Sequence, residues 1–117
     1  MAWTVTNALR DHLAGGGSLR IYNSGATLLS SHSVGTTGVT ANVVTVPFGS
    51  STVEAGVSNQ TADNAEILNS SSVVLLSTND VGTAGADIPF NQVTGWNAGD
   101  TVDPGDADIT LTVAIAV

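Results

Sequence analysis

The chain has 117 residues, a net charge of −8, no cysteine and only 4% aromatic residues. Two arginines and no lysine stand against ten carboxylates, which excludes nucleic acid and anionic membrane surfaces as partners, and the absence of cysteine excludes disulfides and thiolate metal sites. The length predicts one domain that buries roughly 65% of the surface of its unfolded chain, and we expect neither a membrane span nor a secretory signal.

Residues 1–17 predict an N-terminal arm with one short helix between residues 4 and 14, because a capping threonine precedes it and three glycines end it. Leu9 and Leu13 are four residues apart and would share one face of this helix. So short a helix is not stable alone in water. We therefore expect it to dock on the sheet or on a neighbouring chain, with Trp3 as an anchor.

Residues 18–117 predict a β domain, since segments with period-two alternation are separated by turns rich in Gly, Asn, Ser and Pro. The expected strands cover residues 18–23, 27–31, 39–46, 52–58, 65–69, 73–78, 87–93 and 109–117. The segment 73–78 is apolar on both faces and should lie in the interior of a sheet. About eight short strands predict an all-β domain of the β-sandwich or jelly-roll type.

The closing strand carries a large aliphatic residue at every second position from Ile109 to Val117. A strand this apolar invites aggregation at a free edge, so we expect it to pair within the sheet or with another chain. Trp96, in a predicted loop, is the best single candidate for an interface contact. The complete set of predicted interface residues is Trp3, Leu9, Leu13, Trp96, Ile115 and Val117.

A short internal echo relates residues 34–38 (Val-Gly-Thr-Thr-Gly) to residues 81–85 (Val-Gly-Thr-Ala-Gly). Each copy is followed by an apolar segment that reaches Pro-Phe. The strands themselves are not similar in sequence, so we interpret the echo as two equivalent glycine-rich turns and not as a duplication.

No catalytic constellation is recognisable in the sequence. His12 and His32 have no partner at metal-ligand spacing and are expected to be solvated or hydrogen-bonded. Glu54 and Glu66 resemble a glycosidase pair only in residue type, because aromatic platforms for sugar are nearly absent. We therefore expect no enzymatic activity and no cofactor.

Four carboxylates gather in the turn that precedes the closing strand, and they could hold Ca²⁺ through irregular oxygen coordination. Their spacing does not match an EF-hand loop, and a Pro-Gly turn whose aspartates accept local hydrogen bonds is the favoured interpretation. These calcium candidates are Asp100, Asp103, Asp106 and Asp108.

Several short motifs, taken in order along the whole chain, are similar to those of small virion proteins of tailed bacteriophages. The motifs are Thr-Asn-Ala-Leu at 6–9, Leu-Arg-Ile-Tyr at 19–22, Val-Gly-Thr-Ala-Gly-Ala-Asp-Ile at 81–88, Gly-Asp-Thr-Val at 99–102 and Thr-Leu-Thr-Val at 110–113. This resemblance implies a non-enzymatic capsid decoration (cement) protein, and it supplies no site residues.

Such a protein would lie on the outer surface of the head and contact the major capsid protein, a position that suits a chain with almost no cations. Many copies can bind weakly and still stabilise a shell, and a closed homo-oligomer, expected to be a trimer, would shelter the terminal strands. Three alternatives remain open: a tail, baseplate or fibre module that binds host carbohydrate, a hydrolase, and a calcium-dependent adhesion domain.

Overall fold

The computed structural model describes residues 4–5, 17–35, 38–40 and 43–110, and all the secondary structure within them is β. The predicted all-β class is therefore confirmed. The predicted helix falls mainly on residues 6–16, outside the described residues; Thr4 and Val5, at its expected start, form a strand instead. The strands are β1 (Thr4–Val5), β2 (Ser18–Tyr22), β3 (Leu28–Ser33), β4 (Gly38–Thr40), β5 (Val43–Val46), β6 (Ser51–Thr52), β7 (Asn64–Leu68), β8 (Val74–Thr78), β9 (Val81–Gly82), β10 (Ile88–Pro89), β11 (Thr101–Val102) and β12 (Ala107–Thr110).

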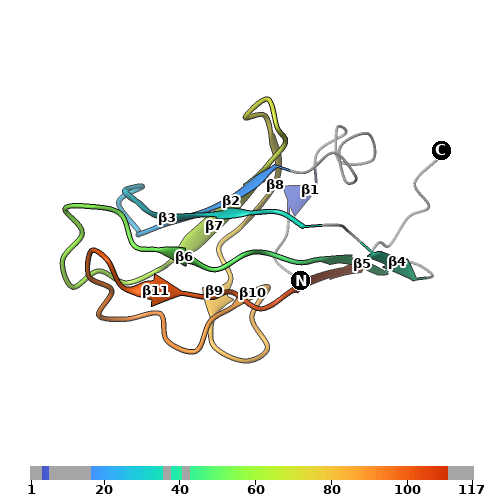
Figure 1. The fold of residues 1–117 in the computed structure, drawn as a ribbon. Coiled ribbons are helices and arrows are strands. Elements are labelled where there is room, and N and C mark those ends of the chain that lie inside the picture. The colour runs from blue at the N-terminus through green and yellow to red at the C-terminus, as the bar shows by residue number, and fades with distance from the viewer. Residues whose placement is uncertain (1–3, 6–16, 36–37, 41–42, 111–117) are drawn as a thin grey trace.

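The largest sheet has five antiparallel strands in the order β1-β8-β7-β2-β3 (Figure 1). Strand β8 is flanked by β1 and β7, so the prediction that the segment around 73–78 lies in the sheet interior is confirmed. Smaller ladders pair β6 with β11, β9 with β10, and β5 with both β4 and β12. The closing strand pairs from its first residues, as expected, since β12 lies antiparallel to β5; residues 111–117 are outside the described part.

Two hairpins of the large sheet are closed by loops of the same geometry. Asn23 and Asn69 each begin a five-residue loop, and each side-chain Oδ1 accepts the backbone amides two and four residues later at 2.9 Å. The fourth loop residue has a left-handed backbone in both, with φ of 65° at Ala26 and 63° at Ser72. Asparagine suits the first position of such a loop because its short side chain supplies the hydrogen bonds that close the turn.

These hairpins, β2–β3 and β7–β8, pack side by side through β2 and β7. The sequence echo lies just beyond them, where β3 and β8 end. Its two copies pair differently: Val34 forms an antiparallel bridge with Phe48, whereas Val81 is paired with Ile88 in a parallel ladder. The first residues of the two copies thus pair differently, whereas the loops of the two hairpins before them have the same geometry.

Backbone hydrogen bonds join β3 to residues 48–54, a segment that faces the large sheet. Besides the Val34–Phe48 bridge, the Glu54 amide donates to the Leu29 carbonyl at 2.8 Å. Strand β6, within this segment, pairs with β11. The chain after β11 then reaches β10, because the Gly105 amide donates to the Pro89 carbonyl at 2.8 Å.

A single apolar core lies between the five-stranded sheet and the strands and loops opposite it (Figure 1). Leu19, Ile21, Leu29 and Leu76 face inward from the sheet and are 0% exposed. Burying each such side chain stabilises the fold by about 1.5–3 kcal/mol. From the opposite side the core receives Val46, Phe48, Val53, Val57, Ile88, Phe90, Trp96, Val102 and Ala107.

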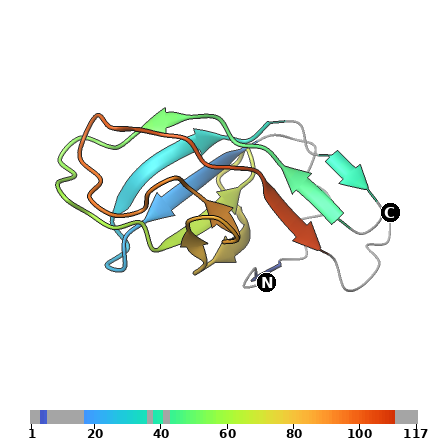
Figure 2. The ribbon, with the colours of Figure 1, turned by 90° about the horizontal axis from the view of Figure 1, so that it is seen from below.

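Three predicted strands are wrong in extent. The expected strand 39–46 is the two-stranded hairpin β4–β5, seen in Figure 2 at the end of the molecule, with Thr40 paired to Val43. The expected strand 52–58 is the end of β6 followed by a turn, and 87–93 contains only β10. In the segments 52–58 and 87–93, turn and loop residues such as Val53, Val57 and Phe90 are buried in the core, and this burial produces the same spacing of apolar residues as a strand.

Candidate functional site

A row of polar residues crosses the face of the large sheet that points away from the core. The strand register places Ser31, Arg20, Glu66 and Ser77 side by side on β3, β2, β7 and β8, and all four are partly exposed. Arg20 lies directly opposite Glu66, where Cβ atoms are about 5 Å apart. Arg20 is also the one Arg or Lys among the described residues.

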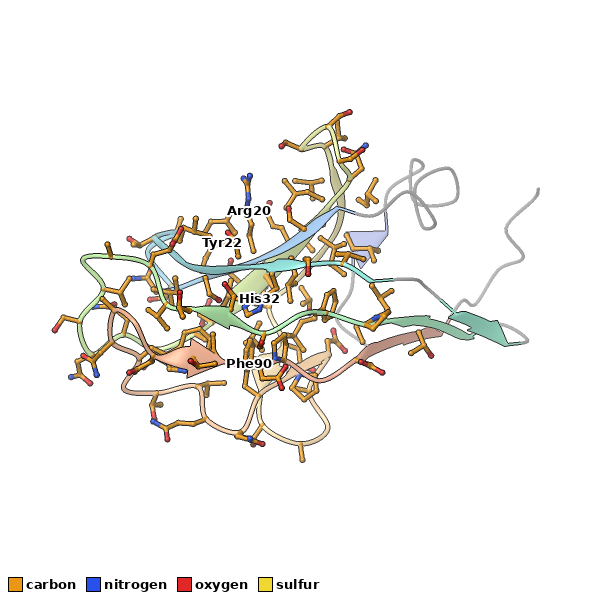
Figure 3. All side chains as sticks on the ribbon, viewed as in Figure 1. Arg20, Tyr22, His32 and Phe90 are labelled. Atoms are coloured by element: carbon orange, nitrogen blue, oxygen red, sulfur yellow. The ribbon has the colours of Figure 1, made fainter. Side chains whose placement is uncertain are left out.

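Tyr22 belongs to the same face as Arg20, two residues further along β2. Figure 3 shows both side chains on the outer side of the sheet, away from His32 and Phe90. Burial raises the pKa of Tyr22, and a hydrogen bond to Glu66 raises it further, while a hydrogen bond to Arg20 acts in the opposite direction. Glu66 and Arg20, which carry opposite charges, thus act on the pKa of the phenol in opposite directions.

Next to this trio lies a shallow cavity of about 270 Å³. Tyr22 and Glu66 form part of its wall, and the remaining lining comes from β7, the end of β8 and the loop after β2. The remaining lining residues are Ala26, Asn64, Ala65, Ser77, Thr78 and Asn79. The cavity therefore offers hydroxyl, amide and carboxylate groups on one outer face of the sheet.

His32 lies on the inner side of β3 and is 2% exposed. Its Nδ1 is 2.7 Å from the Gly49 carbonyl oxygen and its Nε2 is 2.8 Å from Ser30 Oγ. A carbonyl only accepts, so Nδ1 carries the proton and Nε2 accepts from the serine hydroxyl. Burial lowers the pKa of His32, against the smaller opposing effects of the Gly49 hydrogen bond and the Asp103 charge. The prediction of a hydrogen-bonded histidine is confirmed, and this imidazole ties β3 to the β5–β6 connection.

Trp96, the predicted interface residue within the described part, is 2% exposed and belongs to the core. Its indole stacks edge-on against Phe90 at 5.0 Å between ring centroids and donates from Nε1 to the Gln92 carbonyl at 2.9 Å. The structure thus gives Trp96 a role in packing the 90–103 loops, and the indole offers almost no surface to a partner.

The other five predicted interface residues fall outside the described residues, as does His12. These are Trp3, Leu9, Leu13, Ile115 and Val117.

The acidic turn is spread along the chain, and the described side chains of Asp100, Asp103 and Asp106 form no metal-binding group. Asp100 accepts the Asn97 amide at 2.9 Å, as expected of an aspartate in a turn. The charge of Asp103 acts on His32. Asp106 is exposed, and the side chain of Asp108 is outside the described part. Among the residues described, no three His, Asp or Glu side chains gather at metal-binding distance.

A second cavity, of about 320 Å³, opens between these loops. Its lining includes Asp100 and Asp103, with Phe90 and Trp96 also contributing. Both aromatic rings are buried, at 5% and 2% exposure, so neither presents a flat face to a ligand.

The two carboxylates considered as a glycosidase pair lie on different strands. Glu66 is on β7, while Glu54 follows β6 and bonds to the far edge of β3. Strands β2 and β3 lie between β7 and the Glu54 segment, so the two carboxylates do not stand on neighbouring strands.

Period-two alternation within residues 18–23 puts Arg20 and Tyr22 on one face, but it does not single them out as a site. The missing information was the pairing of β2 with β7, which brings Glu66 opposite Arg20 from 46 residues further along the chain. Alternation within each strand identifies the polar face, whereas register between distant strands is a tertiary property.

Comparisons with protein-family models, with curated proteins and with solved structures find no match for this chain. Within the described residues, no helix is both long and apolar enough to span a membrane.

Proposed function

We propose that this chain is a β-sandwich protein that decorates the outer surface of a tailed-bacteriophage head, bridges neighbouring capsomers and catalyses no reaction. The observation that carries the proposal is the combination of an all-β fold with a net charge of −8 and no lysine. Packaged DNA would repel such a protein, so the outer face of the shell is the position that suits its charge.

The sheet organisation supports a bridging role. Within the described residues, β1 ends the five-stranded sheet and β4 ends the three-stranded sheet, and neither has a further strand beyond it. Edge strands carry backbone donors and acceptors that can pair with another chain. We propose that this protein assembles as a trimer and that its sheet edges contact the major capsid protein or its own copies.

The test compares purified heads that carry this protein with heads from which it has been removed. Stripped heads should rupture at a lower temperature, and adding back the purified chain should restore the original temperature. An unrelated protein of equal size and net charge serves as the control and should restore nothing. Equal rupture temperatures with and without the chain would exclude the cement role.

The second candidate is a tail, baseplate or fibre module, and the polar cavity beside Tyr22 is the observation that favours it. Copy number per particle separates the two positions. Hundreds of copies indicate the shell, whereas six or twelve indicate the tail.

A further inference from the structure

The outer face of the five-stranded sheet combines, in one small area, groups that donate, groups that accept and groups that do both. The Arg20 guanidinium can donate, the Glu66 carboxylate can accept, and the phenol of Tyr22 can do both. Ser77 and Asn79, further along the cavity wall, add a hydroxyl and an amide.

Charge narrows the class of ligand. The positive charge of Arg20 has the negative charge of Glu66 directly opposite it, so the face carries no net charge that would select an ion. An anion would in addition be repelled by the chain, because its net charge is −8. A cation would find a single carboxylate in the cavity wall, that of Glu66.

The size and shape of the cavity narrow the class of ligand further. At about 270 Å³ the cavity is close to the lower limit of the roughly 300–1,000 Å³ typical of small-molecule sites. This volume has room for one small molecule. Tyr22 supplies apolar ring surface beside the polar groups, which suits a ligand with both C–H and O–H surface.

We propose that the cavity formed by Tyr22, Glu66, Ser77 and Asn79, with Arg20 opposite Glu66 on the neighbouring strand, binds one uncharged saccharide unit. Sugar hydroxyls both donate and accept, so they match the mixed set of groups, and the ring C–H surface can lie against Tyr22. This inference goes beyond the cement role, and it holds or fails independently of it because it concerns the isolated chain.

The test is saturation-transfer NMR on the full chain with the methyl glycosides of glucose, galactose, mannose and N-acetylglucosamine at millimolar concentration. At least one should receive saturation from the protein, and the same sugar should compete with its own polymer, presented as dextran, galactan, mannan or chitin oligomers. If saturation reaches the glycoside but the polymer does not bind, the cavity is a site for free sugars. If the glycoside and the polymer both bind, the cavity is a site for a terminal unit of a glycan.

Three variants test the location. Glu66→Gln keeps the shape of the side chain but makes it a weaker acceptor of hydrogen bonds from the sugar, so it should reduce the transferred signal at least threefold. Tyr22→Ala should abolish the signal. Asp103→Asn removes the same charge at the other cavity and should leave the signal unchanged. Circular dichroism confirms that each variant is folded. No transfer to any of the four glycosides, or equal loss in Asp103→Asn and Glu66→Gln, would overturn the proposal.

Discussion

Arg20 and Glu66 occupy equivalent positions in two hairpins of the same design and face each other across the β2–β7 pairing. Each lies three residues before the asparagine that closes its hairpin loop, Asn23 or Asn69. The antiparallel register therefore relates the two hairpins by an approximate two-fold axis that passes between Arg20 and Glu66. Beside this axis the two hairpins carry opposite charges, positive at Arg20 and negative at Glu66.

The first prediction concerns this cross-strand pair. Arg20→Glu should place two carboxylates opposite each other and lower the free energy of unfolding by about 0.5–1.5 kcal/mol. The exchanged double variant, with Arg20→Glu and Glu66→Arg, should recover most of that loss. Urea denaturation measures both, and a double variant no more stable than the single one would show that the two charges do not interact.

The second prediction concerns the asparagine loops. Asn23→Ala and Asn69→Ala each remove two side-chain-to-backbone hydrogen bonds, and each should cost about 1–2 kcal/mol. The loss in thermal unfolding should be somewhat larger for Asn23→Ala, because the Asn23 side chain also donates from Nδ2 to Gln60 Oε1 at 3.0 Å. A loss confined to one loop would contradict the equivalence of the hairpins.

A third prediction follows from the backbone of Ala26, which has a φ of 65°. Glycine adopts this conformation without a Cβ clash, so Ala26→Gly should be neutral or should stabilise the protein by up to about 1 kcal/mol. The control is Ala55→Gly in another exposed turn, where φ is not positive and glycine should destabilise by about 0.5–1 kcal/mol. The midpoint of urea unfolding ranks the two, and the reverse order would refute the role of backbone strain.

The fourth prediction is a dependence of stability on pH through His32. Its pKa is lower in the folded chain than the ordinary 6.5, so the folded state favours the neutral ring. The stability that this provides is complete above about pH 6.5 and is lost as the pH falls below that value toward the folded pKa. The free energy of unfolding should therefore fall between pH 7.5 and 5.5.

His32→Asn retains a donor for the Gly49 carbonyl but cannot titrate, and it provides the comparison. Its overall stability should be lower, because a smaller side chain fills the site, yet its stability should change less over the same pH range. Parallel slopes for the two proteins would assign the pH dependence to other groups.

The last prediction distinguishes core from interface at Trp96. Trp96→Ala should cost about 3–5 kcal/mol, a large part of the stability of a domain of this size, because the ring is enclosed by the core. Trp96→Phe should cost less and would remove the hydrogen bond to the Gln92 carbonyl. Near-UV circular dichroism with thermal melting reports both, and a Trp96→Ala variant of unchanged stability would contradict the buried position.

The amino-acid sequence by itself determined the β class and the face of most strands. In β2, alternation assigns Leu19 and Ile21 to the core and Arg20 and Tyr22 to the outside, because successive side chains of a strand point to opposite faces. Composition likewise fixed the acidic surface, since no arrangement of this chain can create cations that it lacks.

Tertiary structure alone decided which strands are neighbours, and with that the sites. Trp96 looked like a loop residue available to a partner, but the 90–103 loops fold over the core and enclose the indole against Phe90. The sequence relates Glu66 only to Glu54, by residue type, whereas the pairing of β7 with β2 sets Glu66 opposite Arg20. Local sequence sets the period of each strand, whereas pairing depends on the burial of apolar faces contributed by residues far apart in the chain.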